Sequence, residues 1–293
     1  MAGQYDLAII GAGFAGLAAA HAAAARGVRT IVLDRKDEAG ARPHTTGLLV
    51  KEVADLWDVP RDLTRKIHGV RLYSPSLQWI DLVRPGYHFL ATDTPALLRW
   101  WAKQARAAGA CVRFRAPWRG ARLDGGRVRL EEHDIHARYM IGADGARSRV
   151  ARDLNLGANR RFLVGVEGEY QGVEGVDEDR LHVFLDSRIA PGYIAWVVPG
   201  VGRTQVGLAV QRGRPANLDA LARRNPPRSR ASPIGQTIRH MVCVRPVSIC
   251  RKTSVQVCQL SRPRLWKKMA CANERNARLP SAQSNTALGG CRS

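Results

Sequence analysis

The sequence predicts an α/β protein with two parts, a parallel sheet flanked by helices and an antiparallel β domain. Three observations carry this prediction. Residues 5–34 have the pattern of strand, glycine turn, helix and strand, residues 162–210 have the pattern of antiparallel strands, and the composition changes sharply after residue 221. At 293 residues the chain exceeds one typical domain and can bury a sizeable core.

The first segment has the spacing of a nucleotide-binding unit. The apolar run 7–10 is typical of a strand buried on both faces of a parallel sheet. It leads into Gly11, Gly13 and Gly16 in G-x-G-x-x-G spacing. The first glycine permits a tight turn, the second lets the backbone approach a pyrophosphate, and the third lets the helix pack close to the strand. Phosphates would then meet free N–H groups at the start of a helix.

An alanine-rich helix is predicted over residues 14–25, because alanine combines high helix propensity with little bulk. The strand that follows, 28–33, ends in Asp34, 18 residues beyond Gly16, where a carboxylate can accept hydrogen bonds from ribose hydroxyls. Strand, glycine turn, helix, second strand and acid all fall in register. We therefore interpret residues 5–34 as a Rossmann-like dinucleotide-binding unit rather than a chance glycine-rich turn.

A polar loop continues from Asp34 and contains Arg35, Arg42 and His44. A cofactor-facing segment would lie here, at the carboxyl end of the strand. A loop histidine beside basic residues is more often a solvated or phosphate-side donor than a catalytic group. We therefore predict no catalytic role for His44.

Short-range signals predict the elements that complete the first part of the chain. In order they are a helix at 48–56, strands at 70–73 and 79–82, a helix from Pro95 to before Gly109, and a meander of strands at 111–114, 121–123, 128–130 and 137–141. Asp93 or Thr94 caps the long helix, and residues 124–126 make a hairpin turn. The last strand leads into Asp144-Gly145, a second carboxylate and glycine turn at a strand end.

Residues 162–170, 180–185, 193–198 and 205–210 predict strands, and glycine and proline mark the turns between them. Their alternating or short apolar patterns favour an antiparallel sheet over a further parallel one. Such a sheet can form the roof of a ligand pocket. The alternative is a purely structural β layer.

The net charge of +21 is unevenly distributed along the chain. Residues 211–293 hold 17 of the 46 basic residues and only two acids, Asp219 and Glu274, so the globular part is only mildly basic. No export signal and no membrane helix is predicted, and Cys111, the only cysteine before residue 240, is typical of a small buried hydrophobe. We expect a cytoplasmic protein, free or in peripheral contact with a membrane, that binds no nucleic acid.

Three separated segments together resemble the para-hydroxybenzoate hydroxylase superfamily of flavoproteins, most closely its geranylgeranyl reductase-like branch, over residues 4 to about 218. The first is the glycine turn with Asp34, which by this resemblance implies FAD with its diphosphate at the turn and its adenosine ribose on Asp34. The second is Asp144-Gly145, whose acid in relatives helps to hold FAD near its diphosphate. The cofactor-binding residues that the resemblance implies are Gly11, Gly13, Phe14, Ala15, Gly16, Asp34, Arg35, Arg42, Asp144 and Gly145.

The third matching segment is residues 193–199, followed by 206–208. It resembles the substrate-side sheet segment of the reductase branch, in which an aromatic pair and a proline line the isoalloxazine pocket. The resemblance thus implies Tyr193, Trp196 and Pro199 as substrate-side residues. Ordinary core packing is the alternative for Trp196.

By the same resemblance, the protein is expected to be an FAD-dependent oxidoreductase that reduces isolated double bonds of a prenyl or isoprenoid-type apolar substrate by hydride from reduced flavin. The alternatives are a flavin monooxygenase, a hydroxylase that uses NAD(P)H and O2, and a truncated, non-catalytic remnant that binds FAD poorly. With one G-x-G-x-x-G in the chain, NAD(P)H or another electron donor is expected to dock transiently. No catalytic side chain and no metal site is predicted, because the chemistry is the flavin's. The sequence does not predict the oligomeric state.

We expect an FAD-binding domain at 1–70 and 90–160 and a substrate-domain sheet at 71–89 and 161–221. After residue 221 the third flavin signature of the family, Gly-Asp followed by Pro and a glycine-led helix, is missing, and Trp266 is the only Phe, Tyr or Trp. Five cysteines are scattered there without the C-x-x-C pairs of a zinc site. We interpret residues 222–293 as the product of a shifted reading frame, outside the native fold, with a disordered basic tail as the alternative.

Overall fold

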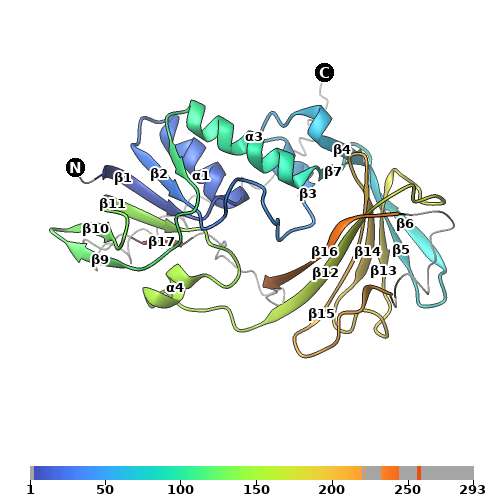
Figure 1. Cartoon of the computed structure of the whole chain (residues 1–293). Coiled ribbons are helices and arrows are strands. Elements are labelled where there is room, and N and C mark those ends of the chain that lie inside the picture. Colours follow the sequence, from blue (N-terminus) through green and yellow to red (C-terminus); the bar gives the residue numbers. More distant parts are fainter. Residues whose placement is uncertain (1–2, 220, 222–231, 244–255, 259–293) are drawn as a thin grey trace, which may run out of the picture.

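The computed structural model describes residues 3–219, 221, 232–243 and 256–258. Figure 1 shows a helix-covered sheet at the left, a large sheet at the right and a small sheet between them at the top. This arrangement confirms the predicted α/β fold with a parallel Rossmann-like sheet and a separate, largely antiparallel sheet.

The first sheet has the strand order β8-β2-β1-β11-β10-β9, with β17 also paired to β11. In that order its strands are Cys111–Arg113, Thr30–Leu33, Gly3–Ile10, Ile135–Gly142, Arg127–Leu130 and Ala121–Asp124, with β17 at Gln256–Cys258. Strands β8, β2, β1 and β11 are parallel, and β10 and β9 are antiparallel. The prediction that β8 opens the meander is wrong, because the preceding helix returns the chain to the edge beside β2.

Two helices cover one face of this sheet, α1 (Phe14–Ala24) and α3 (Thr94–Ala107) (Figure 1). They pack on each other and on the strands in one apolar cluster that includes Leu17, Leu97 and Trp101. Asp93 caps α3 as predicted, accepting a hydrogen bond of 3.1 Å from the N–H of Ala96. A short helix, α4 (Arg149–Asp153), follows β11. None of the helices in the described part of the chain has the length and apolar character needed to cross a membrane.

A three-stranded sheet, in the order β3-β7-β4, joins the two larger layers. Its strands are Leu48–Val50, Phe89–Thr92 and Thr64–Ile67; the short helices α2 (Lys51–Ala54) and η1 (Arg61–Leu63) lie in its connections. The helix predicted at 48–56 is therefore wrong over its first three residues. They form β3 because pairing with β7 and packing of Leu48 on the third sheet override local helix propensity.

The third sheet has the order β16-β12-β15-β14-β13-β5-β6. Its strands are Ser232–Cys243, Phe162–Gln171, Thr204–Gln211, Ala195–Pro199, Arg180–Phe184, Gly69–Tyr73 and Trp79–Val83. The four strands predicted between residues 162 and 210 are all present. The sheet is antiparallel except where β13 pairs with β5 in parallel.

Two strands lie within residues 222–293, for which the sequence predicts no native element. β16 pairs along most of β12, and β17 pairs with the end of β11. The expectation of a wholly unstructured segment is therefore not met at these residues. The remainder of 222–293 lies outside the described residues, and the interpretation as a shifted reading frame stays a prediction.

Candidate functional site

The glycine turn lies between β1 and α1, and its three glycines have different surroundings. A Cβ on Gly11, whose φ is +110°, would lie 2.3 Å from the carbonyl oxygen of Ala143, and a Cβ on Gly16 would lie 1.8 Å from that of Gly11. A Cβ on Gly13 would have no atom within 4 Å. Two of the glycines therefore allow close packing of backbone, whereas the third borders open space.

That open space lies at the amino terminus of α1. Gly13 is the N-cap residue, no side chain caps the helix, and the first turn contains no acidic residue. The N–H groups of Phe14, Ala15 and Gly16 have no carbonyl partner within the helix, since the first i to i−4 bond runs from Leu17 to Gly13. Free N–H groups, the helix dipole and the space beside Gly13 together fit a diphosphate.

Asp34 lies at the end of β2, and only 9% of its surface is exposed. One carboxylate oxygen accepts a 2.6 Å hydrogen bond from the N–H of Ala12, and the other accepts a 2.8 Å bond from that of Lys36. The carboxylate thus ties the glycine turn to the loop after β2. This contact was not foreseen from the sequence. The predicted ribose contact would use the lone pairs that remain, and it stays a prediction.

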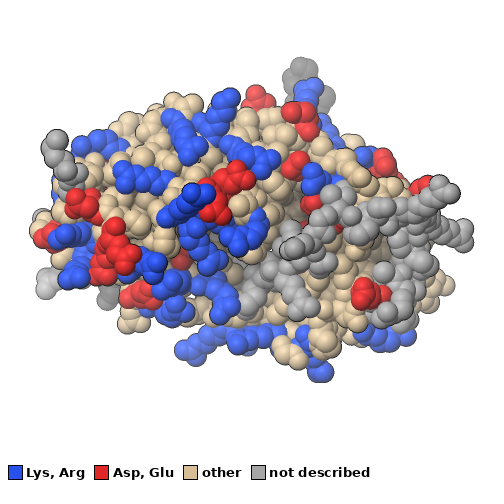
Figure 2. Space-filling model, in the orientation of Figure 1, with Lys and Arg blue, Asp and Glu red and all other residues tan. Residues whose placement is uncertain are grey.

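A group of basic side chains surrounds Lys36 in the same loop. The Lys36 ammonium donates to the carbonyl of Arg42 at 3.3 Å, and burial lowers the pKa of this lysine. Burial, with the charges of Lys36, Arg35 and Arg42, also lowers the pKa of His44. The structure therefore brings Arg35, Arg42 and His44 together around Lys36, which the sequence analysis did not single out. Figure 2 shows Lys and Arg spread over the left half and the middle of the face on view, with Asp and Glu among them.

The turn after β11 lies beside the glycine turn, because β1 and β11 are neighbouring parallel strands with Ile10 opposite Gly142. In this turn Asp144 accepts hydrogen bonds from the Ser148 hydroxyl (2.5 Å), the Arg149 N–H (2.7 Å) and the Val150 N–H (3.2 Å). The structure thus brings the two sequence signatures together. It also gives Asp144 a local role at the start of α4.

Substitution of Asp144 separates this local role from cofactor binding. Asp144→Ala should lower the stability of the FAD-free protein by about 1 kcal/mol, because α4 loses acceptors at its first turn. A larger loss is expected with FAD bound if the carboxylate also holds the cofactor. Melting temperatures with and without FAD measure both effects.

Ser148→Ala is the matched control for Asp144→Ala. It removes the bond to Asp144 and the 2.9 Å bond that the hydroxyl accepts from the Ala151 N–H, yet leaves the carboxylate in place. We expect equal destabilisation with and without FAD for this variant. Equal losses for Asp144→Ala as well would show that Asp144 acts only on α4.

On the third sheet, Trp196 is 6% exposed and lies in β14 with Pro199 at the end of the strand. It shares an apolar cluster with Leu163, Val198 and Ala209, against which Ile67 and Ala91 of the small sheet also pack. This face therefore presents an apolar wall toward the small sheet.

Tyr193 lies before β14, is 46% exposed and belongs to none of the buried clusters of the described residues. The structure thus places Trp196 and Pro199 on one strand but does not bring Tyr193 into the apolar cluster with Trp196. The expected substrate-side role of Tyr193 stays a prediction.

Glu167 is a residue that the sequence analysis missed. It lies in the middle of β12, is 4% exposed and accepts a 3.1 Å hydrogen bond from the indole Nε1–H of Trp196. Burial raises its pKa from 4.5 to about 7, the charge of Glu169 adds to this, and the indole bond opposes it. The available signal was a carboxylate in the centre of a predicted strand, where two strand neighbours leave little access to water.

Arg203 joins the third sheet to the helix-covered sheet. Its guanidinium lies in the turn between β14 and β15 and donates to Glu169 at 2.7 Å and to Asp93, the cap of α3, at 3.5 Å. This ion-pair link fixes the apolar wall relative to the start of α3.

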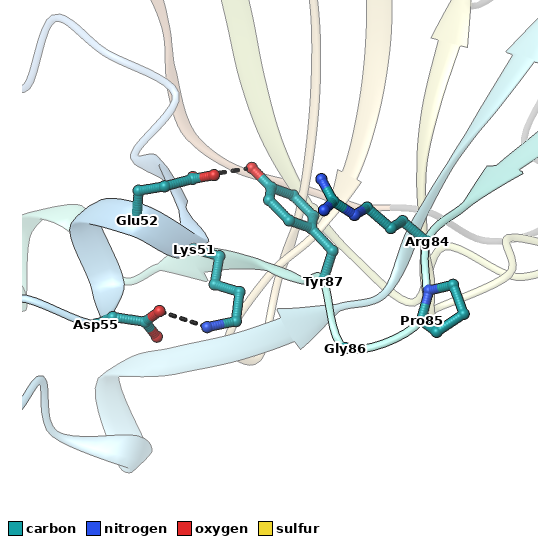
Figure 3. Close-up of a pocket in the computed structure, with 7 residues that line it drawn as sticks. All are labelled: Lys51, Glu52, Asp55, Arg84, Pro85, Gly86 and Tyr87. Carbon is teal, nitrogen blue, oxygen red and sulfur yellow. Dashed lines mark hydrogen bonds and ion pairs between the residues drawn. The ribbon is translucent and has the colours of Figure 1, made fainter. Parts of the chain in front are cut away.

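A separate pocket of about 240 Å³ lies between α2 and the turn that connects β6 to β7 (Figure 3). The Tyr87 hydroxyl donates to Glu52 at 3.2 Å, and Lys51 forms an ion pair with Asp55. The residues that line this pocket are Lys51, Glu52, Asp55, Arg84, Pro85, Gly86 and Tyr87. None of these residues belongs to the glycine turns or to the apolar wall.

Comparison with known proteins agrees with this geometry. Residues 6–93 match the family of FAD dependent oxidoreductases. The chain is 32% identical over 232 residues to digeranylgeranylglycerophospholipid reductase 2 of Methanopyrus kandleri, covering 74% of this chain and 58% of that protein. It is 28% identical over 221 residues to geranylgeranyl diphosphate reductase of Rhodobacter capsulatus, covering 71% and 55%. The chain thus spans little more than half the length of these relatives.

A solved structure extends the likeness to most of this chain. The geranylgeranyl bacteriochlorophyll reductase-like protein of Thermoplasma acidophilum superposes with a TM-score of 0.75 at 25% identity, over 86% of this chain and 69% of that one. The shared fold agrees with the one that we expected from the two glycine turns and the antiparallel sheet. Residues 6–93 of the chain thus resemble an FAD dependent oxidoreductase domain, and the relatives that the chain is similar to are named as reductases of geranylgeranyl and digeranylgeranylglycerophospholipid compounds.

Proposed function

We propose that the protein uses FAD to reduce isolated double bonds of a prenyl or isoprenoid-type lipid. The observation that carries the proposal is the apolar wall around Trp196, in a chain whose relatives are named as reductases of geranylgeranyl compounds. An apolar wall with few polar groups suits a hydrocarbon chain, which has no hydrogen-bonding groups for a polar site to recognise.

The residues at the carboxyl ends of β1, β2 and β11 would hold FAD. The N–H groups at the start of α1 would meet its diphosphate beside Gly13, and Asp34 and Asp144 would contact its sugar portions and diphosphate region. The basic group around Lys36, which includes Arg35 and Arg42, adds positive potential beside the same anion. When bound, reduced flavin supplies the hydride that such a reduction requires.

The prenyl chain would lie beside the apolar wall, whose own side chains are already buried against the small sheet, and the wall would keep water away from it. Burial of apolar surface is worth roughly 25 cal/mol per Å², so a long prenyl chain gains affinity with each unit that reaches the wall. Electrons would arrive from NAD(P)H or another donor that docks transiently. A lipid substrate would bring the protein into peripheral contact with a membrane surface.

A single-turnover experiment tests the proposal. The FAD-loaded protein is reduced photochemically without oxygen and mixed with geranylgeranyl diphosphate. We expect the flavin to reoxidise and the lipid to gain about 2 Da for each double bond reduced, as each reduction adds one hydride and one proton. Absorbance follows the flavin, and mass spectrometry follows the lipid.

Fully saturated phytanyl diphosphate is the matched control, because it offers the same chain and charge without a double bond to reduce. It should leave the flavin reduced. A hydroxylase would behave differently: NADPH oxidation would rise in air on addition of a phenol, with oxygen consumed and a hydroxylated product formed. That result would replace the proposed reductase activity.

A further inference from the structure

Three residues form a row across three adjacent strands of the third sheet. Trp196 of β14 lies opposite Gly207 of β15, and Gly207 lies opposite Glu167 of β12. Residues opposite one another in neighbouring strands point to the same face of a sheet. The indole and the carboxylate therefore extend toward each other over the glycine, and they meet in the 3.1 Å hydrogen bond.

The glycine is what allows this contact. A Cβ on Gly207 would lie 2.6 Å from two carbon atoms of the Trp196 indole and 2.7 Å from its nitrogen. Any other residue at this position would push the ring off the strand and away from the carboxylate. Gly207 has no positive φ that would explain its presence by backbone conformation. A glycine is needed here because the Trp196 ring lies directly over this position.

We propose that Glu167 is a positioning residue that holds the indole of Trp196 flat across Gly207, so that the ring forms a fixed part of the wall against which the prenyl chain lies. This inference rests on the proposed reductase function. In this proposal the Glu167 carboxylate is a polar anchor for one side chain of the apolar wall, the indole of Trp196. Without the anchor, only the packing contacts of its apolar cluster would hold the indole over Gly207.

The described side chains around Glu167 give it no partner for an ion pair. On the same strand, Glu169 belongs to a separate set, in which Arg203 bonds Glu169 and Asp93. No described cation lies within ion-pair distance of Glu167, and its only described hydrogen bond comes from Trp196. A buried carboxylate without a cation is costly. The hydrogen bond from the indole is the described contact that offsets part of this cost.

The strand pairing beside Glu167 is irregular in a way that fits a site. The pairing of β12 with β16 shifts register between Glu167 and Glu169, as in a β-bulge. Such irregularities re-aim side chains and are frequent beside functional sites. Burial raises the pKa of Glu167 to about 7, so its charge changes near neutral pH and the strength of the indole bond changes with it.

The test uses the indole N–H signal of Trp196 in the NMR spectrum, identified by its loss in Trp196→Phe. Glu167→Leu should move this signal upfield, because the ring loses its acceptor, and Glu167→Gln should restore it through the amide oxygen. At pH 5, where Glu167 is protonated, Glu169→Gln, on the same strand but bonded to Arg203, should leave the signal in place. In the unaltered protein the signal should shift between about pH 6 and pH 8 as the carboxyl ionises.

Turnover supplies the second readout. Glu167→Leu should raise KM for geranylgeranyl diphosphate about tenfold, in keeping with the loss of a hydrogen bond to a buried charged group, with a smaller change in kcat. Trp196→Phe should have a similar effect on KM. The double variant should be no worse than either single variant, because each substitution breaks the same hydrogen bond between the indole and the carboxylate. Additive losses, or failure of Glu167→Gln to restore KM, would overturn the proposal.

The two readouts separate this inference from the proposed function. If the unaltered protein reduces no prenyl lipid, the proposed function fails, whereas the indole signal still decides whether Glu167 holds the ring. If turnover is present and the indole signal is unmoved by Glu167→Leu and by pH, the positioning role is wrong. Glu167→Leu is not needed for the pH titration, which uses the unaltered chain.

Discussion

Gly13→Val is expected to abolish retention of FAD while the protein keeps its fold. The position has φ −86° and ψ −175°, which any residue adopts, and a Cβ there meets no atom within 4 Å. The valine therefore extends into the space beside the first N–H groups of α1, where the diphosphate would lie. We expect the dissociation constant for FAD to rise well over tenfold, a loss of more than about 1.4 kcal/mol.

Ala22→Val is the matched control, because it adds the same side chain to the last turns of α1. It should cost about 0.5 kcal/mol in helix propensity and leave FAD binding unchanged. Bound flavin per protein after gel filtration measures retention, and circular dichroism checks the fold. Normal FAD content in Gly13→Val would mean that the cofactor does not lie at this turn.

Gly16→Val should differ from Gly13→Val by disrupting the fold itself. Its Cβ would lie 1.8 Å from the carbonyl oxygen of Gly11, so α1 cannot pack against β1. The protein should then lose structure as well as flavin. The three glycines have the same chemistry and are distinguished only by what lies next to each, which is why their spacing is informative in the sequence.

Local patterns predicted the first unit well because its constraints are local. At Gly11 and Gly16 the strand, turn and helix pack so closely that only glycine, which has no Cβ, fits. The glycines in the sequence therefore indicate this packing directly. The cap at Asp93 is local in the same way. Elements whose state depends on distant partners were harder: β8 pairs with β2, and β3 pairs with β7, over long separations in the chain.

In the candidate site, too, features set by local sequence were predicted and features set by distant partners were not. The two glycine turns were foreseen, whereas Glu167 was not, because its importance comes from a tryptophan on another strand and a glycine between them. The family resemblance implied Tyr193 and Trp196 as an aromatic pair on the substrate side. The structure leaves Tyr193 exposed before β14, where its side chain is not in the apolar cluster. Sequence spacing of three residues does not fix which way each side chain faces at a strand end.

Glu167→Gln is expected to make the folded protein more stable at pH 8 than the unaltered chain, and to lose this advantage in acid. Burial raises the pKa of the folded-state carboxyl to about 7 from 4.5. Below pH 4.5 the carboxyl is protonated in both the folded and the unfolded chain, so ionisation costs nothing. Between pH 4.5 and about 7 the unfolded chain releases its proton first, and stability falls as pH rises.

The shift from 4.5 to about 7 corresponds to about 3 kcal/mol of stability, lost by the time pH exceeds 7. Glutamine does not ionise, so the variant lacks this loss. The amide of glutamine buries an additional N–H donor, which costs the same free energy at every pH. This constant cost does not affect the comparison of how the stability of the two proteins depends on pH. Urea denaturation at pH 5, 6, 7 and 8 gives the difference directly.

Glu169→Gln provides the contrast, since the same change two residues along β12 breaks the 2.7 Å ion pair with Arg203. It should destabilise the protein at pH 8 rather than stabilise it, by up to about 1 kcal/mol for a partly exposed pair. A flat difference between Glu167→Gln and the unaltered protein from pH 5 to pH 8 would show that Glu167 is ionised in the folded state throughout. In that case Glu167 would carry a charge beside the apolar cluster of Trp196 at every pH from 5 to 8.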